Sequence, residues 1–373
     1  MLAGLPPFRT PTMTLHLVYE KEWVPSTRIR LVQLVPELEA RGWRCRIAAY
    51  PADARARRRF AAELGPDDVV LVHRARPTRA AARWWRAQPV PIVFDFDDAI
   101  MYGQRGGVLG ALSRRRRAAG FRRMLASCNA VACGNSFLAA QCAEFPGPVC
   151  VLPSAVPGDV PQADPGRRGP LRVGWVGRSG NLRYLRAIAP ALARAASRRP
   201  LLLVVLSDQG LELPDVPVEH QPWDLASEAA CVARFDVGLM PLDLAGPWSR
   251  GKCAYKLLQY MAAGVPAIGS DVGMNAELIE HDRNGLLARD LADWERLLVE
   301  LADDPARRAR LGAAGRRTVL EGYTVEAVAD RLAALLDGLR GASAPSRSGS
   351  VAATTGATAN ASALRRSAAA GGG

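Results

Sequence analysis

Short apolar runs alternate with segments of helical periodicity along most of this chain. Seven runs have the length of β-strands and fall into two sets, at 15–19, 45–49, 69–72 and 91–94, and at 171–177, 201–206 and 237–240. Strands that alternate with helical segments are typical of parallel sheets joined by crossover helices. The pattern therefore predicts an α/β fold.

The two sets of strands are separated by residues 157–170, which are dense in Pro, Gly and Asp and form a predicted hinge. With 373 residues, 49% of them hydrophobic, the chain can bury two cores. We expect two Rossmann-like domains, 13–156 and 171–340, that face each other across a cleft. Residues 1–12 are predicted to be a flexible N-terminus. Residues 341–373 are rich in Ser, Ala, Thr and Gly, which predicts a disordered tail.

A candidate anion site lies where an apolar-periodic segment begins after Gly251 and Lys252 and ends at the Gly-Val-Pro of 264–266. The first N–H groups of a helix lack partners within it, so a phosphate can bind there, with Lys252 or Lys256 supplying charge. Residues 267–270 then read as a buried strand. Ligands of open α/β sheets bind at the carboxyl ends of such strands.

A second candidate anion contact follows the run that opens the second set. Gly177, Ser179 and Gly180 are small enough for backbone N–H groups to approach a diphosphate. Arg178 could bind the same group with two hydrogen bonds. A plain strand-to-helix turn with an exposed arginine remains the alternative.

Three motifs then occur in a fixed order: M-A-A-G-V-P at 261–266, S-D-V-G at 270–273 and N-G-L-L at 284–287. In this order they resemble the C-terminal signature of retaining GT-B glycosyltransferases of family 4, the glycosyl transferases group 1. That family also carries two glutamates with seven residues between them. Here the corresponding positions are Gly251 and Gln259.

The resemblance implies a GT-B enzyme that transfers a sugar with retention from a nucleotide-sugar, bound in the C-terminal domain, to an acceptor held by the N-terminal domain. It implies neither a metal nor a separate cofactor, because the nucleotide-sugar is a substrate. Arg178, Lys252 and Lys256 would stabilise the leaving diphosphate. The remaining implied donor-side residues are Gly177, Ser179, Gly180, Arg183, Trp223 near the base, Gly251, and Gln259 near the ribose. An inactive sugar-nucleotide-binding protein is the non-catalytic alternative.

Asp95, Asp97 and Asp98 crowd the end of the run at 91–94, although close negative charges repel each other. We interpret the cluster as the acceptor side, where Asp97 or Asp98 orients or deprotonates a sugar hydroxyl. The alternatives are a metal-binding D-x-D of a GT-A transferase, structural capping, and a haloacid-dehalogenase-like phosphatase with Asp95 as nucleophile and Asp97 as acid.

Nearer the N-terminus, Ser26 is a candidate cap for a helix over 31–40, and Arg28 or Arg30 is a candidate contact to the acceptor or to a phosphate. His73 and Arg74 end another strand and could also face the cleft. The alternative is that His73 is packed or solvated, as a lone histidine more often is.

The net charge of +13 is concentrated in arginine clusters at 55–59, 74–86 and 113–123. Such patches attract anionic membranes or nucleic acid. Residues 108–125 read as an amphipathic helix suited to a membrane surface, and no nucleic-acid-binding motif accompanies the charge. We therefore expect an anionic membrane as a candidate partner, no nucleic acid, and an acceptor that is a glycan, a lipid-linked sugar or a small molecule.

Neither a signal peptide nor a membrane span is predicted, because no apolar run is long enough. The expected location is the cytoplasm, including the inner face of the membrane. The seven cysteines are scattered without C-x-x-C pairs, which predicts neither disulfides nor a zinc site.

Overall fold

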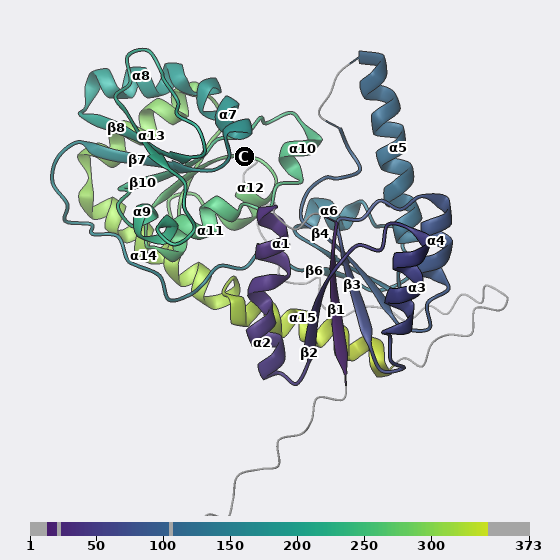
Figure 1. Ribbon diagram of the computed structural model, residues 1–373. Helices are drawn as coiled ribbons and strands as arrows, with labels where there is room; N and C mark the ends of the chain where they lie inside the picture. The colour runs from purple at the N-terminus through teal and green to yellow at the C-terminus, as the bar shows by residue number, and fades with distance from the viewer. Residues whose placement is uncertain (1–12, 21–23, 104–106, 342–373) are drawn as a thin grey trace, which may run out of the picture. The chain divides into compact units, whose positions relative to one another are not determined.

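Two six-stranded parallel sheets organise the protein, in a computed structural model that describes residues 13–20, 24–103 and 107–341 (Figure 1). In the first sheet the strand order is β2-β1-β3-β4-β5-β6. Its strands are β1 (Thr14–Tyr19), β2 (Arg44–Ala49), β3 (Val69–His73), β4 (Ile92–Phe96), β5 (Ala130–Cys133) and β6 (Val149–Val151). The helices of this half are α1 (Pro25–Arg30), η1 (Val32–Leu34), α2 (Val35–Ala40), α3 (Ala54–Ala62), α4 (Arg79–Arg86), α5 (Gly107–Leu125) and α6 (Ser136–Ala140).

The second sheet has the order β12-β11-β10-β7-β8-β9. Its strands are β7 (Leu171–Val176), β8 (Leu201–Ser207), β9 (Val218–Pro222), β10 (Val237–Met240), β11 (Ala267–Ser270) and β12 (Leu286–Ala288). The helices of this half are η2 (Ser179–Asn181), α7 (Leu182–Ala187), α8 (Ala189–Arg198), α9 (Glu228–Val232), α10 (Pro247–Arg250), α11 (Tyr255–Ala262), α12 (Met274–Leu278), α13 (Leu291–Asp303) and α14 (Pro305–Gly322). The predicted α/β fold with two Rossmann-like sheets is confirmed.

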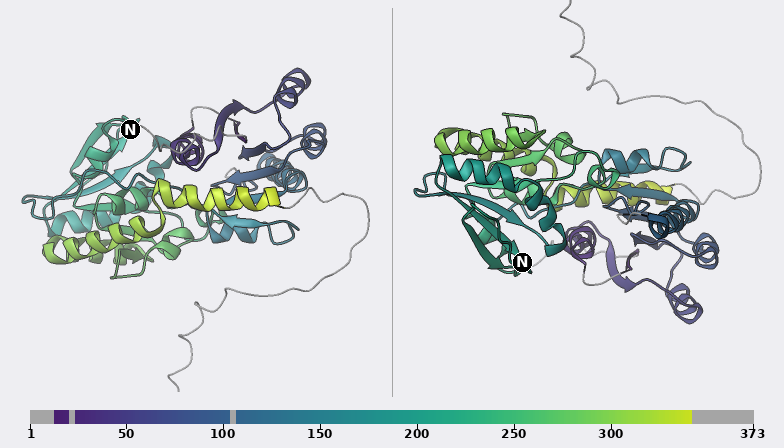
Figure 2. Two further views of the ribbon diagram at one scale, coloured as in Figure 1. Left: turned by 90° about the horizontal axis from the view of Figure 1, so that it is seen from below. Right: turned by 90° about the horizontal axis from the view of Figure 1, so that it is seen from above.

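The last helix, α15 (Val325–Gly341), packs on the first half rather than the second. Val328, Leu332 and Leu336 are fully buried in one cluster with Leu15 and Leu17 of β1. Figures 1 and 2 show α15, in yellow, beside the first sheet. The exact domain limits given by the sequence stay a prediction, and the expected flexible N-terminus, together with the tail from residue 342, lies outside the described residues.

Each sheet reverses its strand order at one point. In the first sheet the chain goes from β1 outward to β2 and then returns to β3, so the reversal lies between β1 and β3. In the second sheet it lies between β7 and β10. Ligands of open α/β sheets bind outside the carboxyl ends of the strands at such switch points.

The helix expected over 108–125 is present as α5, which extends from the other helices in Figure 1, although its apolar residues are not concentrated on one face. Leu109 is 83% exposed and Leu112 is 47% exposed, next to the exposed arginines 114–116. Among the described helices, none combines the length and the apolar character that crossing a membrane requires.

Candidate functional site

The two lysines near α11 occupy different positions relative to that helix. The helix begins at Tyr255, three residues later than Lys252, because Ala254 takes a left-handed conformation with φ 48°. Lys252 therefore lies in the loop after α10, and Lys256 lies in the first turn of α11. The helix expected after Gly251 and Lys252 is present as α11.

Lys256 is a half-buried ammonium group with no counterion among the residues that the structure describes. Its Nζ lies 5.4 Å from the ring centre of Trp175, and it forms no hydrogen bond or ion pair with any residue that the structure describes. Burial, followed by the charge of Lys252, lowers the pKa of Lys256 to about 8. A Cβ at Gly177 would lie 2.9 Å from Lys256 Cε, so the glycine is what lets the lysine pass close to the end of β7.

Lys252 already has an acidic partner, which comes from the other half of the chain. Its Nζ lies 3.0 Å from Asp98 Oδ1, and Arg74 Nη2 lies 3.0 Å from Asp98 Oδ2. Burial alone would raise the pKa of Asp98, but Lys252 and Arg74 together lower it below its usual value. Asp98 is therefore an ionised carboxylate held between two cations.

Asp95 is a buried anchor rather than an acceptor contact, which corrects its expected place on the acceptor side. It is 1% exposed, and both of its oxygens bond to Arg30, while His73 Nδ1 lies 2.6 Å from its Oδ2. Burial opposes ionisation, yet Arg30 and His73 lower the pKa of Asp95 to about 2. Since both oxygens are occupied and solvent is excluded, Asp95 is unsuited to the nucleophilic role of the phosphatase interpretation.

His73, which the sequence analysis considered as a residue that could face the cleft, lies beside Asp95 and Asp97. Its Nε2 and Asp97 Oδ1 lie 3.9 Å apart, and both are buried atoms without a hydrogen bond among the described residues. His73 lines a cavity of about 170 Å³ at the end of β3. The one signal in the sequence was its position at the end of a strand, which becomes informative only when β3 is known to flank the switch point.

In the glycine-rich loop after β7, hydrogen-bond donors expected to contact a phosphate are already bonded to another residue of the protein. The Ser179 amide and hydroxyl donate to Asp208 Oδ1 and Oδ2, at 2.7 and 2.9 Å. The donors predicted to meet a phosphate are thus already bound to a carboxylate. Arg178 is exposed and has no partner in the described part of the chain, and a Cβ at Gly180 would meet only open space.

Arg183 lies two residues beyond η2, in the first turn of α7. Its guanidinium donates to Tyr184 Oη at 3.0 Å and lies 4.8 Å from the centre of that ring. Tyr184 is close enough to Lys252 to influence its charge. Arg183 therefore contacts a tyrosine that lies near Lys252.

Trp223 and Arg28 meet at one acidic residue. Trp223 is 42% exposed and donates its Nε1–H to Glu228 Oε1 at 2.7 Å. Arg28 Nη2 lies 3.8 Å from Glu228 Oε2.

Ser26 is not a helix cap, because α1 begins at Pro25 with Val24 as its cap. The Ser26 hydroxyl instead accepts a hydrogen bond from Arg74 at 3.0 Å.

Gly251 is a point of close approach between the two halves. A Cβ there would lie 2.6 Å from the Ala99 Cβ and 3.0 Å from the Ala99 nitrogen. Nearby, Asn135 Nδ2 donates to the carbonyls of Arg250 and Lys252 at 3.1 and 3.0 Å. A glutamate cannot occupy position 251 unless the Ala99 segment moves. Gln259 is half-buried on α11, and its side chain has no hydrogen bond to a described residue.

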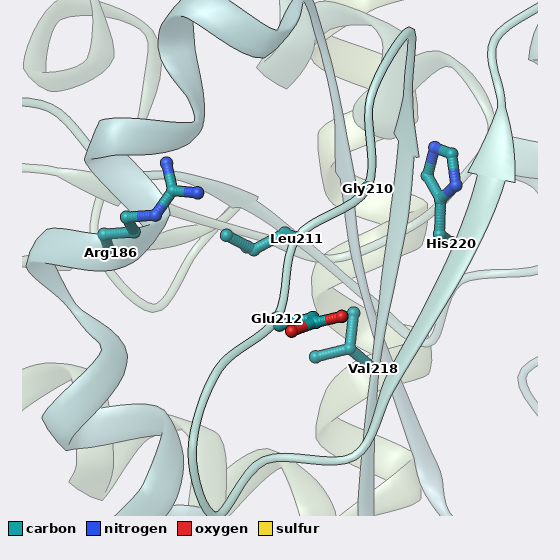
Figure 3. A pocket seen from close by; sticks show the side chains of 6 residues that line it. All are labelled: Arg186, Gly210, Leu211, Glu212, Val218 and His220. Carbon is teal, nitrogen blue, oxygen red and sulfur yellow. The ribbon is translucent and has the colours of Figure 1, made fainter.

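A larger hollow, of about 670 Å³, lies away from these lysines, between α7 and β9. Figure 3 shows Arg186 on one side, Val218 and His220 on the other, and the loop 210–212 between them. His220 Nε2 lies 3.1 Å from the Ser207 carbonyl at the end of β8. The hollow thus adjoins the loop that carries Asp208.

Residues 219–334 match a family model described as "Glycosyl transferase-like". A GDP-mannose-dependent monoacylated α-(1-6)-phosphatidylinositol monomannoside mannosyltransferase from Corynebacterium glutamicum is 38% identical over 81 residues. That match spans 21% of this chain and 21% of the mannosyltransferase. The family match includes the segment with the three motifs, and the mannosyltransferase match spans about a fifth of the chain, so neither concerns the whole protein.

Solved structures with this fold include sucrose-phosphate synthase from Thermosynechococcus elongatus, with a TM-score of 0.66, 17% identity and coverage of 89% of this chain and 100% of that one. Anabaena HepE in complex with UDP-glucose has a TM-score of 0.65 at 11% identity, covering 87% and 99%. The lipopolysaccharide outer core galactosyltransferase WaaB has a TM-score of 0.62 at 12% identity, covering 87% and 99%. The predicted resemblance to GT-B glycosyltransferases is confirmed.

Proposed function

We propose that this GT-B protein is a glycosyltransferase that moves a sugar from a nucleotide-sugar donor, bound at the second sheet, to an acceptor hydroxyl at the first sheet. The family match within 219–334 supports the assignment. So does the fold, which HepE shares in its complexes with UDP and UDP-glucose.

The observation that carries the proposal is Lys256, a desolvated cation without a counterion, held beside Gly177 at the switch point of the second sheet. As the bond to the sugar breaks, negative charge accumulates on the leaving diphosphate. A positioned cation in a site with little water stabilises that charge more than it would in bulk water. Lys256 provides this cation, and Arg178 can reach the same group from its exposed position after β7.

On the acceptor side, His73 and Asp97 are the groups that would meet the sugar hydroxyl. Because ionised Asp95 can only accept hydrogen bonds, His73 Nδ1 must be the donor between them. In the neutral imidazole this leaves Nε2 with a lone pair, 3.9 Å from Asp97 Oδ1. The pair can orient the hydroxyl and accept its proton.

We further propose that transfer proceeds with retention and without a metal ion, as the family resemblance implies. Lys252 and Lys256 would supply the positive charge that a metal ion supplies in other transferases. Proton NMR of the first-formed product determines the anomeric configuration. Transfer that persists in a chelator and is not raised by added Mg²⁺ or Mn²⁺ supports metal independence, and a loss that Mn²⁺ restores would contradict it.

Contact with an anionic membrane through α5 is part of the proposal. Exposed Leu109 and Leu112 beside three exposed arginines are the combination that binds a membrane interface. Binding to anionic vesicles should weaken when both leucines become serine. Equal sedimentation of this variant and the unchanged protein would exclude α5 as the contact.

An inactive binding protein is the second candidate, and one observation favours it. The Ser179 amide and hydroxyl, which would donate to a phosphate, already donate to Asp208. In addition, Gly251 and Gln259 replace the two glutamates of the family that the sequence resembles. A thermal-shift screen of nucleoside diphosphates finds the nucleotide, because a ligand that binds only the folded state raises its stability. Single-turnover hydrolysis of the matching donor then separates the candidates, since an inactive binder would not break the glycosidic bond.

The role of the acidic strand end has its own test. Asp97→Asn or Asp98→Asn should reduce transfer, while nucleoside diphosphate binding stays close to that of the unchanged protein. Asp208→Asn is a matched acidic control from the donor side. If both acceptor-side variants transfer at the normal rate, the acceptor assignment is wrong.

A further inference from the structure

The small cavity of about 170 Å³ lies at the switch point of the first sheet. Glu20, Val24 and Thr27 line it from the segment after β1, and His73, Arg74 and Arg76 line it from the segment after β3. Arg117 of α5 and Trp248 of α10 complete the wall, together with Ile100. A cavity outside the carboxyl ends of β1 and β3 occupies the position where open α/β sheets bind ligands.

The charge of this cavity is not balanced by the protein. Arg74 is paired with Asp97 and Asp98, but Arg76 and Arg117 form no ion pair with a described residue. Arg76 donates only a long hydrogen bond, 3.4 Å, to the Ile100 carbonyl among the described residues. Burial and then the charge of Arg117 lower the pKa of Arg76, and the carboxylate of Glu20, which also lines the cavity, offsets them only in part.

Uncharged polar atoms also point to a missing partner. The Trp248 indole N–H and His73 Nε2 are buried, and neither has a hydrogen bond in the described part of the chain. His73 as a whole is 1% exposed. Buried polar groups are satisfied in most proteins, so the unpaired N–H donor of Trp248, a residue that lines this cavity beside Arg76 and Arg117, indicates a ligand that accepts hydrogen bonds. The lone pair of His73 Nε2 fits a ligand hydroxyl instead.

We infer that this cavity binds a phosphate group carried by the acceptor, through Arg76, Arg117 and the Trp248 N–H. The inference rests on the proposed transferase function and adds the class of acceptor to it. Arginine matches a phosphate because its planar fork can donate two parallel hydrogen bonds. The adjoining His73 and Asp97 would then hold the acceptor hydroxyl while the phosphate fixes its orientation.

The phosphate could belong to a soluble sugar phosphate or to a lipid headgroup, and the same chemistry serves both. Arg117 lies on α5, whose N-terminal part carries exposed Leu109 and Leu112. The cavity wall and the candidate membrane surface are therefore parts of one helix. Soluble and lipid-borne phosphates need separate arms in the experiment.

The test compares Arg76→Gln and Arg117→Gln with exposed arginines that do not line the cavity. Arg116→Gln on the same helix is the control for calorimetry. Arg317→Gln on α14 is the control for vesicles, because Arg116 belongs to the candidate membrane surface. Calorimetry measures the binding of glycerol 3-phosphate, with glycerol as the neutral control, and cosedimentation measures binding to phosphatidylinositol vesicles. A Lys256→Met background removes the donor-side cation as a second phosphate site. Each cavity variant should bind one of the phosphate probes at least about tenfold more weakly, while Arg116→Gln binds glycerol 3-phosphate normally and Arg317→Gln binds vesicles normally.

Either source of phosphate supports the inference if its binding depends on Arg76 and Arg117. Equal binding by the cavity variants and Arg116→Gln, or no binding of either probe, would overturn it. Arg76→Lys keeps the charge without the fork, so an intermediate loss separates recognition from misfolding. Nucleoside diphosphate binding and donor hydrolysis, measured with Lys256 intact, should be unchanged in the cavity variants; their absence in the unchanged protein would instead count against the proposed transferase function.

Discussion

Binding of a nucleoside diphosphate should weaken as the pH rises through about 8, because Lys256 then loses its proton. Its pKa is lowered from 10.5 to about 8, so the charged form prevails below this pH and the neutral form above it. If the phosphate needs the ammonium form, affinity falls by at most tenfold per pH unit above the pKa. The fall ends when the contact is lost, at about 1.5–3 kcal/mol, or roughly tenfold to over a hundredfold in Kd.

The assay is calorimetry from about pH 7 to about 9.5, where the terminal phosphate, with its last pKa near 6, is already ionised. Lys252 keeps its proton over this range, because Asp98 raises its pKa above the usual value despite burial. Lys256→Arg should bind tightly with a flat pH profile, and Lys256→Met should bind weakly with a flat profile. The reasoning fails if Lys256→Met retains the slope of the unchanged protein, or if that protein shows no slope.

Three further outcomes are expected. Gly251→Ala should lower kcat/KM for transfer, since its Cβ would press on Ala99 at 2.6 Å; normal kinetics would show that the two halves do not approach this closely during turnover. Asp95→Asn should destabilise folding by about 3–5 kcal/mol in urea titrations, because Arg30 is left as an unpaired buried charge. Because its pKa is lowered from 3.8 to about 2, ionised Asp95 contributes a pH-linked part of the stability, which is present in full above pH 3.8 and is lost as the pH falls through 2. A constant difference between variant and parent down to that pH would refute the assignment. Gln259→Ala should weaken nucleotide binding while Gln259→Glu retains it; unchanged Kd values for both would remove Gln259 from the ribose.

The sequence predicted the central strands well, because they carry the strongest apolar signal. All residues of β3, β4, β5 and β11 are buried. The strands β6, β9 and β12 were not predicted, and all three lie at the edges of their sheets. An edge strand is short or half-exposed, as in the V-E-H-Q-P of β9, so its side chains do not need to be apolar.

The sequence identified cations and carboxylates of the candidate site, but it did not show which residues contact each other. The partners Lys252 and Asp98 are 154 residues apart in the chain, and Ser179 and Asp208 are 29 apart. Pairs of this kind depend on how the sheets are placed, which local patterns do not encode. The left-handed Ala254 was equally hidden, because alanine favours helices and gives no signal of a helix boundary.

The position of α15 bears on how the protein is made. Its buried residues Val328, Leu332 and Leu336 cover one face of the first sheet, yet they are among the last described residues to be synthesised. A ribosome that has released residues 13–156 has produced all six strands of that sheet but not the helix that closes its core. The apolar surface of the first half that α15 covers therefore stays exposed until the second half has been synthesised. Synthesis that stalls before residue 325 should accordingly yield an aggregation-prone chain.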